Sequence, residues 1–203
     1  MTGPQRISIF PLAGALLFPE MQLPLHIFEP RYRAMVRDAM ARDRRIGMIQ
    51  PRDEAQVPAL FSIGCVGRIS NVEALDDGRF NIVLTGIARF RVLRELDVST
   101  PFRQVEAELT PPVEESPLAP AERAALELEA RRFADQQGYM IDWNAVTRLD
   151  DASLVNGIAQ VAPFDPAAKQ SLLEAADLRE RMELTIQLMR FFGRADENGG
   201  TMQ

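Results

Sequence analysis

Short apolar segments alternate with polar residues over the first 110 positions of the chain. Three of them, RISIFPL (6–12), RIGMIQ (45–50) and FSIGCVGRISNVEAL (61–75), are rich in β-branched and aromatic residues, as strands are. In the third, Cys65, Ile69 and Val72 are expected to point inward, around candidate bulges at Gly64 and Gly67. Two further segments, IARFRVLREL (87–96) and FRQVEAEL (102–109), also alternate. This half of the chain therefore predicts several short strands.

Two local signals are sharper than the rest. The sequence LDDGRFNIVLTG (75–86) places Asp77 and Gly78 between apolar-rich segments, which predicts a tight hairpin turn with glycine at positive φ. Glu29 followed by Pro30 marks a helix start, because proline costs no hydrogen bond at the first helical position. In RYRAMVRDAMARD (31–43) the apolar residues recur every three or four positions, which predicts a helix with one apolar face. His26 and Phe28 precede this helix in an extended segment.

The second half of the chain predicts helices. Residues 111–120, PPVEESPLAP, hold four prolines and are expected to form a stiff linker between the two halves. Good helix formers follow up to Gly138, and two later segments begin with capping aspartates, the second being Asp165 with Pro166 at the first helical position. We expect a β-rich domain over 1–110, a bundle of about four helices over 121–193 and a flexible tail over 194–203.

The charge is uneven between the two halves. The net charge of the whole chain is -6. Residues 1–110 hold 14 basic and 13 acidic residues, a net of +1, whereas residues 111–203 hold 9 basic and 16 acidic residues, a net of -7. An acidic protein gives no general electrostatic reason to expect binding to nucleic acid or to an anionic membrane. The longest early apolar stretch is short and contains Pro11 and Pro19, so we expect no membrane segment.

Common catalytic and metal-binding patterns are missing from the sequence. The single cysteine, Cys65, excludes an intramolecular disulfide and a CxxC zinc pair, and favours a reducing, cytoplasmic compartment. The single lysine, Lys169, has no glycine-rich phosphate loop before it, and Ser171, two positions away on a helix, faces another direction. We therefore expect no metal, no cofactor and no catalytic residue.

The single histidine, His26, is the remaining candidate for acid–base chemistry. No GxSxG segment accompanies it, and Cys65 lies in an apolar strand, where a lone cysteine is usually a small core residue. We interpret His26 as a packed, hydrogen-bonded residue rather than a catalyst, although a small hydrolase that uses His26 or Cys65 remains a third hypothesis. Glu29 with Arg31 or Arg33 is expected to order the helix start rather than to act on a substrate.

A basic stripe on the predicted strands could meet phosphates or an acidic peptide. Its residues are Arg68, Arg79, Arg89, Arg91 and Arg94. The acids Glu73, Asp76, Glu95 and Asp97 lie between them, so we favour a solvated, partly neutralised sheet face over a nucleic-acid site.

The long segment FPLAGALLFPEMQLPLHIFEPRYRAMVRDAMARDRRIGMI, followed by GCVGRISNVEALDDGRFNIVLTGIARFRV, resembles the N-terminal substrate-binding domain of the ATP-dependent Lon protease family. The resemblance covers about residues 6–110 closely, and is greatest to free-standing bacterial members with a short helical C-terminal part. Within it, the family-motif residues Pro24, His26, Phe28, Glu29, Pro30, Arg31 and Tyr32 are expected to be structural.

This resemblance implies the fold and a function. It implies an α+β protein with a PUA-like β-barrel or sandwich carrying one or two helices, followed by a small α-helical bundle. It also implies a non-catalytic module that binds unfolded or degron-bearing polypeptides, as an adaptor in protein quality control or proteolysis that works with a separate ATP-dependent protease. Nothing in residues 111–203 resembles the ATPase or protease modules of the family. The alternative hypothesis is RNA binding, since other PUA-like barrels bind RNA.

The apolar loop LLFPEMQLPL (16–25) is the candidate polypeptide-binding surface. Leu17, Phe18, Met21 and Leu23 are expected to leave apolar groups exposed beside the barrel. The competing interpretation is that these residues simply cover an open end of the barrel.

Overall fold

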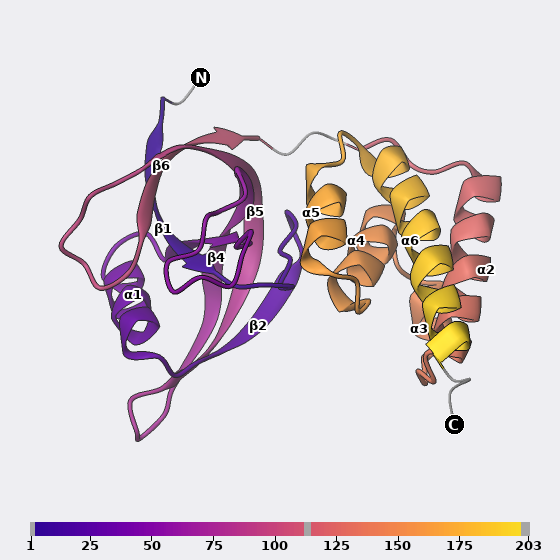
Figure 1. The fold of residues 1–203 in the computed structure, drawn as a ribbon, viewed down its shortest axis with the longest axis horizontal. Coiled ribbons are helices and arrows are strands. Elements are labelled where there is room, and N and C mark those ends of the chain that lie inside the picture. Colours follow the sequence, from indigo (N-terminus) through magenta and orange to yellow (C-terminus); the bar gives the residue numbers. More distant parts are fainter. Residues whose placement is uncertain (1–2, 112–114, 200–203) are drawn as a thin grey trace. The chain divides into compact units, whose positions relative to one another are not determined.

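The computed structural model describes residues 3–111 and 115–199, with only the backbone described for 194–199. The chain divides into two compact units, Met1–Val113 and Glu114–Gln203, which we call the barrel unit and the helical unit (Figure 1). Residues 112–114 of the expected linker and 200–203 of the expected tail lie outside the described residues. Among the described residues, no helix is both long enough and apolar enough to cross a membrane.

The barrel unit contains six strands and one helix. In chain order they are β1 (Gln5–Pro11), β2 (Gln22–Ile27), α1 (Pro30–Met40), β3 (Arg45–Ile49), β4 (Ile63–Ala74), β5 (Phe80–Glu95) and β6 (Gln104–Thr110). The sheet order is β2-β5-β4-β3-β1-β6, and a further pairing joins β6 to β5. Strands β5, β4, β3, β1 and β6 thus close into a barrel, while β2 is an additional strand on β5 (Figure 1). The α+β class and the barrel implied by the resemblance are confirmed.

The long strand β5 makes this closure possible. Its first half pairs with β2, from Gln22 opposite Thr85 to Ile27 opposite Phe80, and its second half pairs with β6. Strand β4 runs antiparallel to most of β5 and is joined to it by the expected hairpin turn. Gly78 in that turn has φ +79°, the left-handed conformation that favours glycine.

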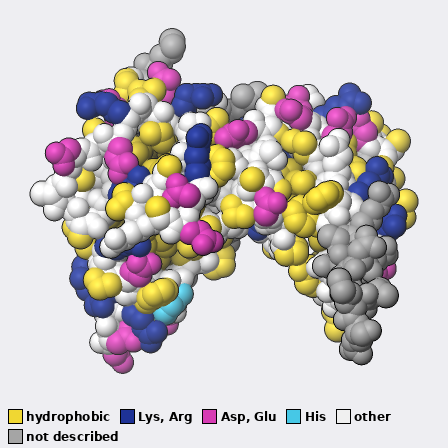
Figure 2. Space-filling view, in the orientation of Figure 1, with side chains coloured by type: hydrophobic (Ala, Val, Ile, Leu, Met, Phe, Trp, Pro, Cys, Tyr) yellow, Lys and Arg dark blue, Asp and Glu magenta, His cyan; other side chains and the backbone are white. Residues whose placement is uncertain are grey.

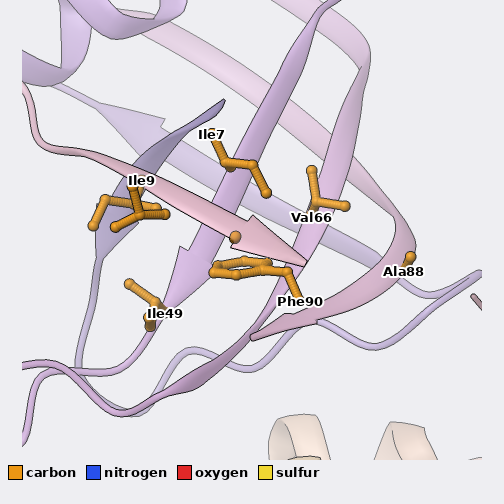
Figure 3. Packing of buried hydrophobic residues seen from close by; sticks show 8 residues of the cluster. Ile7, Ile9, Ile49, Val66, Ala88 and Phe90 are labelled. Carbon is orange, nitrogen blue, oxygen red and sulfur yellow. The ribbon is translucent and has the colours of Figure 1, made fainter. Parts of the chain in front are cut away.

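The barrel core is filled from the inner face of every strand of the closed sheet. Figure 3 shows Ile7, Ile9, Ile49, Val66 and Ala88 around the ring of Phe90, which is fully buried. The ring needs glycine on the neighbouring strands, because a Cβ on Gly64 would lie 2.5 Å from Cζ of Phe90. Gly64 is therefore a packing position and not the expected bulge. The register between β4 and β5 shifts twice. Between Val66 and Gly67 the extra residue is Ile87 of β5, so the bulge expected in β4 at Gly67 is wrong, whereas between Ile69 and Asn71 the extra residue is Ser70 of β4.

Helix α1 covers the barrel with the face that the sequence predicted. Tyr32, Met35, Val36 and Ala39 are buried, and the ring of Tyr32 packs on Phe10 of β1 with 4.1 Å between ring centroids. The helix begins at Pro30, as expected. The helix also carries Arg31 and Arg37, which are exposed, and Arg33, which is half-buried.

Over residues 115–199 the helical unit contains five helices, against the bundle of about four that the sequence predicted. They are α2 (Pro120–Gln136), α3 (Trp143–Val146), α4 (Asp151–Val161), α5 (Pro166–Glu174) and α6 (Leu178–Gly199). Helix α6 continues past the expected end of the bundle at residue 193. It packs against α2, α4 and α5, and a ring cluster of Phe133, Phe164 and Phe192 fills the space between helices.

Local signals set the helix boundaries in this unit. The Asp150 and Asp165 side chains accept hydrogen bonds from the Ser153 and Ala168 amides, at 2.8 and 2.7 Å, as N-caps do. Gly138 follows α2 with φ +69°. These caps confirm the helix starts that the sequence predicted.

A buried arginine organises the centre of the helical unit. Arg181 of α6 is 1% exposed and donates hydrogen bonds to Asn156 of α4, at 2.9 Å, and to the Leu172 carbonyl at the end of α5. It also forms an ion pair with Glu115, at 3.0 Å. Burying a guanidinium costs free energy unless its charge is paired and its donors are hydrogen-bonded. Here the partners come from three separate segments.

Candidate functional site

The candidate apolar loop before β2 is held against the barrel. Leu17 and Phe18 are 1% and 0% exposed, so the expected exposure of these two side chains is wrong. The physical reason is a backbone contact: Glu20 donates a hydrogen bond to the Gly86 carbonyl and Gly86 donates one to the Met21 carbonyl. A Cβ on Gly86 would lie 1.9 Å from the Phe18 carbonyl oxygen. Glycine at this position lets the loop approach β5 closely and bury its apolar residues.

Met21 and Leu23 differ from the first two loop residues. Both are half-buried, and Leu23 lies in β2, opposite Leu84 of β5. Strand β2 is the last strand in the sheet order, and its residues alternate between exposed and half-buried positions. Pro24 lies within it, as prolines do on edge strands. Met21 and Leu23 thus remain candidates for contact with a partner.

The motif residues after Leu25 surround the end of β2. The Phe28 side chain is 60% exposed, and its ring stacks on His26 with 6.2 Å between centroids. Glu29 forms an ion pair with Arg31, at 2.9 Å, at the start of α1. This pair orders the helix start, as expected. The guanidinium of Arg31 also lies 4.6 Å from the ring centroid of Tyr32.

His26 is exposed, which corrects the expectation that it is packed. It is nevertheless hydrogen-bonded: Nδ1 lies 2.7 Å from Oδ1 of Asn81, and Nη1 of Arg79 lies 3.3 Å from Nε2. Asn81 in turn donates to Glu73, at 2.7 Å. Arginine can only donate, so Nε2 accepts and Nδ1 carries the proton. None of these partners is a nucleophile.

The other nucleophile candidates are also held in structural contacts. Cys65 is fully buried in β4, and burial raises the pKa of its thiol to about 12. Ser171 donates to the Ala168 carbonyl, whereas Lys169 donates to the Gln160 carbonyl at the end of α4. Desolvation lowers the pKa of Lys169. Among the described residues, no group of three or more His, Cys, Asp or Glu side chains could hold a metal ion.

The predicted basic stripe is not one cluster. Arg79 forms an ion pair with Asp77 in the hairpin turn, at 2.6 Å, while Arg94 pairs with Glu106 of β6, at 2.7 Å. Arg68 and Arg89 lie on β4 and β5 between these ends. The paired acids neutralise part of the stripe.

From the sequence, Arg33 of α1 was expected only as an alternative partner of Glu29, which pairs with Arg31 instead, and Arg37 was not singled out. Both Arg33 and Arg37 lie close to Gly78 in the hairpin turn, with Nη2 of Arg33 2.2 Å from where a glycine Cβ would be. Their spacing of four residues places them on one helix face. The spacing shows in the sequence that the two arginines share a helix face. It does not show that this face approaches the hairpin turn.

One sequence family matches nearly the whole chain. The model of the family described as the ATP-dependent protease La (LON) substrate-binding domain matches residues 6–190. The chain belongs to this Lon substrate-binding domain family. The match extends well beyond the barrel unit and includes most of the helical unit.

Curated relatives agree with this membership of the Lon family. Lon protease 2 of Myxococcus xanthus is 28% identical over 197 residues, which cover 92% of this chain and 24% of the relative. Lon protease 2 of Sorangium cellulosum is 30% identical over 198 residues, covering 90% of this chain and 24% of the relative. The chain thus spans about a quarter of the length of these relatives.

Solved structures of Lon N-terminal domains share the fold. A Lon N-terminal domain protein from Xanthomonas campestris has a TM-score of 0.68 at 23% identity, and the alignment covers 90% of this chain and 98% of that one. The N-terminal domain of a Mycobacterium avium complex Lon protease has a TM-score of 0.63 at 22% identity, covering 92% and 98%. The combination of barrel and helices is therefore the Lon N-terminal fold, and only this part of Lon is matched.

Proposed function

We propose that this chain is a non-catalytic module that binds polypeptides for a proteolytic system. The observation that carries the proposal is the match of residues 6–190 to a domain described as substrate-binding. The side chains support it, because His26, Cys65 and Lys169 are all held in contacts that involve no catalytic partner. The proposed clients are unfolded or degron-bearing segments, which a separate ATP-dependent protease in the cytoplasm would degrade.

The proposed binding surface is the free edge of β2 and the residues that follow it. Met21 and Leu23 are half-buried at this edge, on the side of the strand that also carries the buried Ile27, and Phe28, just after the strand, is 60% exposed. An edge strand is a common place for an extended polypeptide to bind, since alternate side chains can contact the partner. Leu17 and Phe18 are left out of this surface because they are buried.

Binding of a chemically denatured, fluorescently labelled protein tests this function. We expect the purified chain to bind it, and each of Met21→Ala, Leu23→Ala and Phe28→Ala to weaken binding, by up to about tenfold for an anchor residue. Leu93→Ala is the matched control, because Leu93 is an exposed apolar residue (45%) elsewhere in the barrel unit. Absence of binding above that of an inert protein, or an equal loss in the Leu93 variant, would contradict the proposal.

RNA binding is the weaker candidate and we do not propose it. The stripe that suggested it is interrupted by ion pairs at Arg79 and Arg94. A nucleic-acid surface would instead leave its guanidinium groups available to phosphates.

A further inference from the structure

The guanidinium groups of Arg33 and Arg37 converge on the hairpin turn between β4 and β5. A Cβ on Gly78 would lie 2.2 Å from Nη2 of Arg33 and 3.7 Å from Nη2 of Arg37. Both groups therefore lie over the backbone of this glycine, where any other residue would displace them. Arg37 is also placed by an aromatic contact, since its guanidinium carbon lies 5.7 Å from the ring centroid of Phe80.

These two positive charges have no ion-pair partner of their own, although the Asp77 carboxylate, which pairs with Arg79, lies near enough for Arg33 to help lower its pKa. Within the described part of the chain, neither Arg33 nor Arg37 forms an ion pair. The acids on the same segments have other partners or none: Asp77 pairs with Arg79, Glu29 with Arg31 and Asp38 with Arg42, while Asp76 pairs with no described residue. Like charges four residues apart on a helix repel each other, so the pair is an arrangement that a bound anion would stabilise.

A buried polar atom points to the same conclusion. Nε of Arg33 is buried and has no hydrogen-bond partner among the described residues. An unsatisfied buried donor costs free energy and is rare in native proteins. A guanidinium presents its donors as a planar fork that matches the two oxygens of a carboxylate. Nε itself is enclosed, so a ligand with such oxygens would bind through the Nη groups of Arg33 and Arg37.

The surroundings indicate that the carboxylate belongs to a polypeptide. His26 connects the turn to the end of β2, because it contacts Arg79 next to Gly78 and its ring stacks on the exposed Phe28. In Figure 2 dark blue basic side chains and yellow apolar side chains gather around the cyan histidine at this end of the barrel unit. An apolar contact beside paired guanidiniums suits a segment that carries acidic and apolar residues close together.

We propose that Arg33 and Arg37 bind a carboxylate of an acidic polypeptide segment, whose neighbouring apolar residue contacts Phe28. This inference rests on the proposed polypeptide-binding function and names its substrate class. It makes the α1 end of the barrel unit a specificity-determining part of that surface. Clients that carry Asp or Glu next to an apolar residue are then preferred over otherwise identical neutral clients.

Two fluorescent peptides test the inference with the full chain. They share apolar residues and differ only in that one carries Asp and Glu where the other carries Asn and Gln. We expect the acidic peptide to bind about tenfold more tightly, and this advantage to disappear in the double variant Arg33→Gln/Arg37→Gln. Added salt is expected to weaken the acidic peptide selectively. The double variant Arg33→Lys/Arg37→Lys keeps the charge but loses the planar fork, and is expected to retain only part of the advantage.

Arg68→Gln/Arg91→Gln is the charge-matched control, since both arginines are exposed, on β4 and β5, and away from the turn. An equal loss in this control, or no preference for the acidic peptide, would overturn the inference. If the neutral peptide and denatured protein bind without any such preference, the proposed function stands and only the carboxylate site fails. If neither peptide nor denatured protein binds, both fail.

The NMR signal of the Arg33 Nε–H group gives a readout at the site itself. We expect the acidic peptide to shift this signal and the neutral peptide to leave it nearly unchanged. Inorganic phosphate serves as a small-anion probe. A shift with phosphate and none with the acidic peptide would overturn the polypeptide proposal, because it would indicate a site for small anions.

Discussion

At the scale of single residues, the only cysteine in the chain is a core residue and not a reactive thiol. Cys65 is fully buried, its Sγ lies 3.7 Å from the Val66 carbonyl oxygen, and burial raises its pKa to about 12. The thiolate is the reactive form. We therefore expect a thiol reagent at mildly alkaline pH to label the native protein far more slowly than the urea-unfolded chain. Labelling at similar rates in both states would contradict this.

The same raised pKa makes a prediction about alkaline stability. The unfolded chain releases the Cys65 proton near the ordinary pKa of about 8.5, while the folded protein keeps it until about pH 12. The unfolded state then holds fewer protons, so the stability that this group contributes falls as pH rises between these values. We expect Cys65→Ala to lose less of its unfolding free energy than the wild type over this range, as measured by urea titration. Parallel decreases in the two proteins would contradict the prediction.

Gly64 tests the packing of the barrel core. A Cβ there would lie 2.4 Å from the Met48 carbonyl oxygen and 2.5 Å from Cζ of Phe90. The first of these atoms is backbone and cannot move aside cheaply. We expect Gly64→Ala to lower the free energy of unfolding by about 1–3 kcal/mol. Gly3→Ala is the control, since nothing lies within 4 Å of its Cβ position, and an equal effect of both would refute the packing argument.

At the scale of whole elements, the N-cap of α4 links stability to acidity. Hydrogen bonds from the Ser153 amide and hydroxyl lower the pKa of Asp150. The stability that the Asp150 carboxylate contributes is fully present above its ordinary pKa of about 4. This stability is lost as pH falls toward the lower pKa of the folded protein. We expect Asp150→Ala to cost about 1 kcal/mol at neutral pH and less in acid. Asp150→Asn keeps an acceptor and does not titrate, so its effect at neutral pH should be smaller. A deficit of the alanine variant that stays constant with pH would contradict this account.

The elements that the sequence predicted correctly are those with local signals. The hairpin turn needs only Asp77 and Gly78, α1 needs Pro30 and one apolar face, and the helix starts need their capping aspartates. Barrel closure could not be predicted in this way, because it depends on β5 pairing with β2 at one end and β6 at the other. Where strand β2 lies, the sequence predicted only an extended segment before the helix.

The candidate site shows the same limit. Exposure of Leu17 and Phe18 was inferred from a proline-studded apolar loop, but their burial depends on Gly86, far along the chain, which lets the loop approach β5. The convergence of Arg33 and Arg37 likewise depends on Gly78, which follows them by many residues. In both cases a glycine on a distant segment decides where the side chains lie, and one sequence does not show that proximity.

At the scale of the whole molecule, each unit carries a single natural probe. Cys65 lies in the barrel unit, and the only tryptophan, Trp143, lies in the helical unit, where the Arg131 guanidinium is 4.3 Å from its ring centroid. Thiol labelling and tryptophan fluorescence therefore report on different units. This makes it possible to ask in one urea titration which unit a substitution destabilises.

Arg181→Met is the substitution that suits this comparison. It leaves Asn156 and Glu115 without their buried partner, and removing one partner of such a network costs about 3 kcal/mol. Because the aromatic and polar core of the helical unit is built from its own helices, we expect the variant to shift the Trp143 transition more than Cys65 labelling. Gly64→Ala is the matched substitution in the barrel unit and should have the opposite pattern. If each substitution instead shifts both probes equally, the two units unfold as one cooperative body and the expectation of separate transitions is wrong.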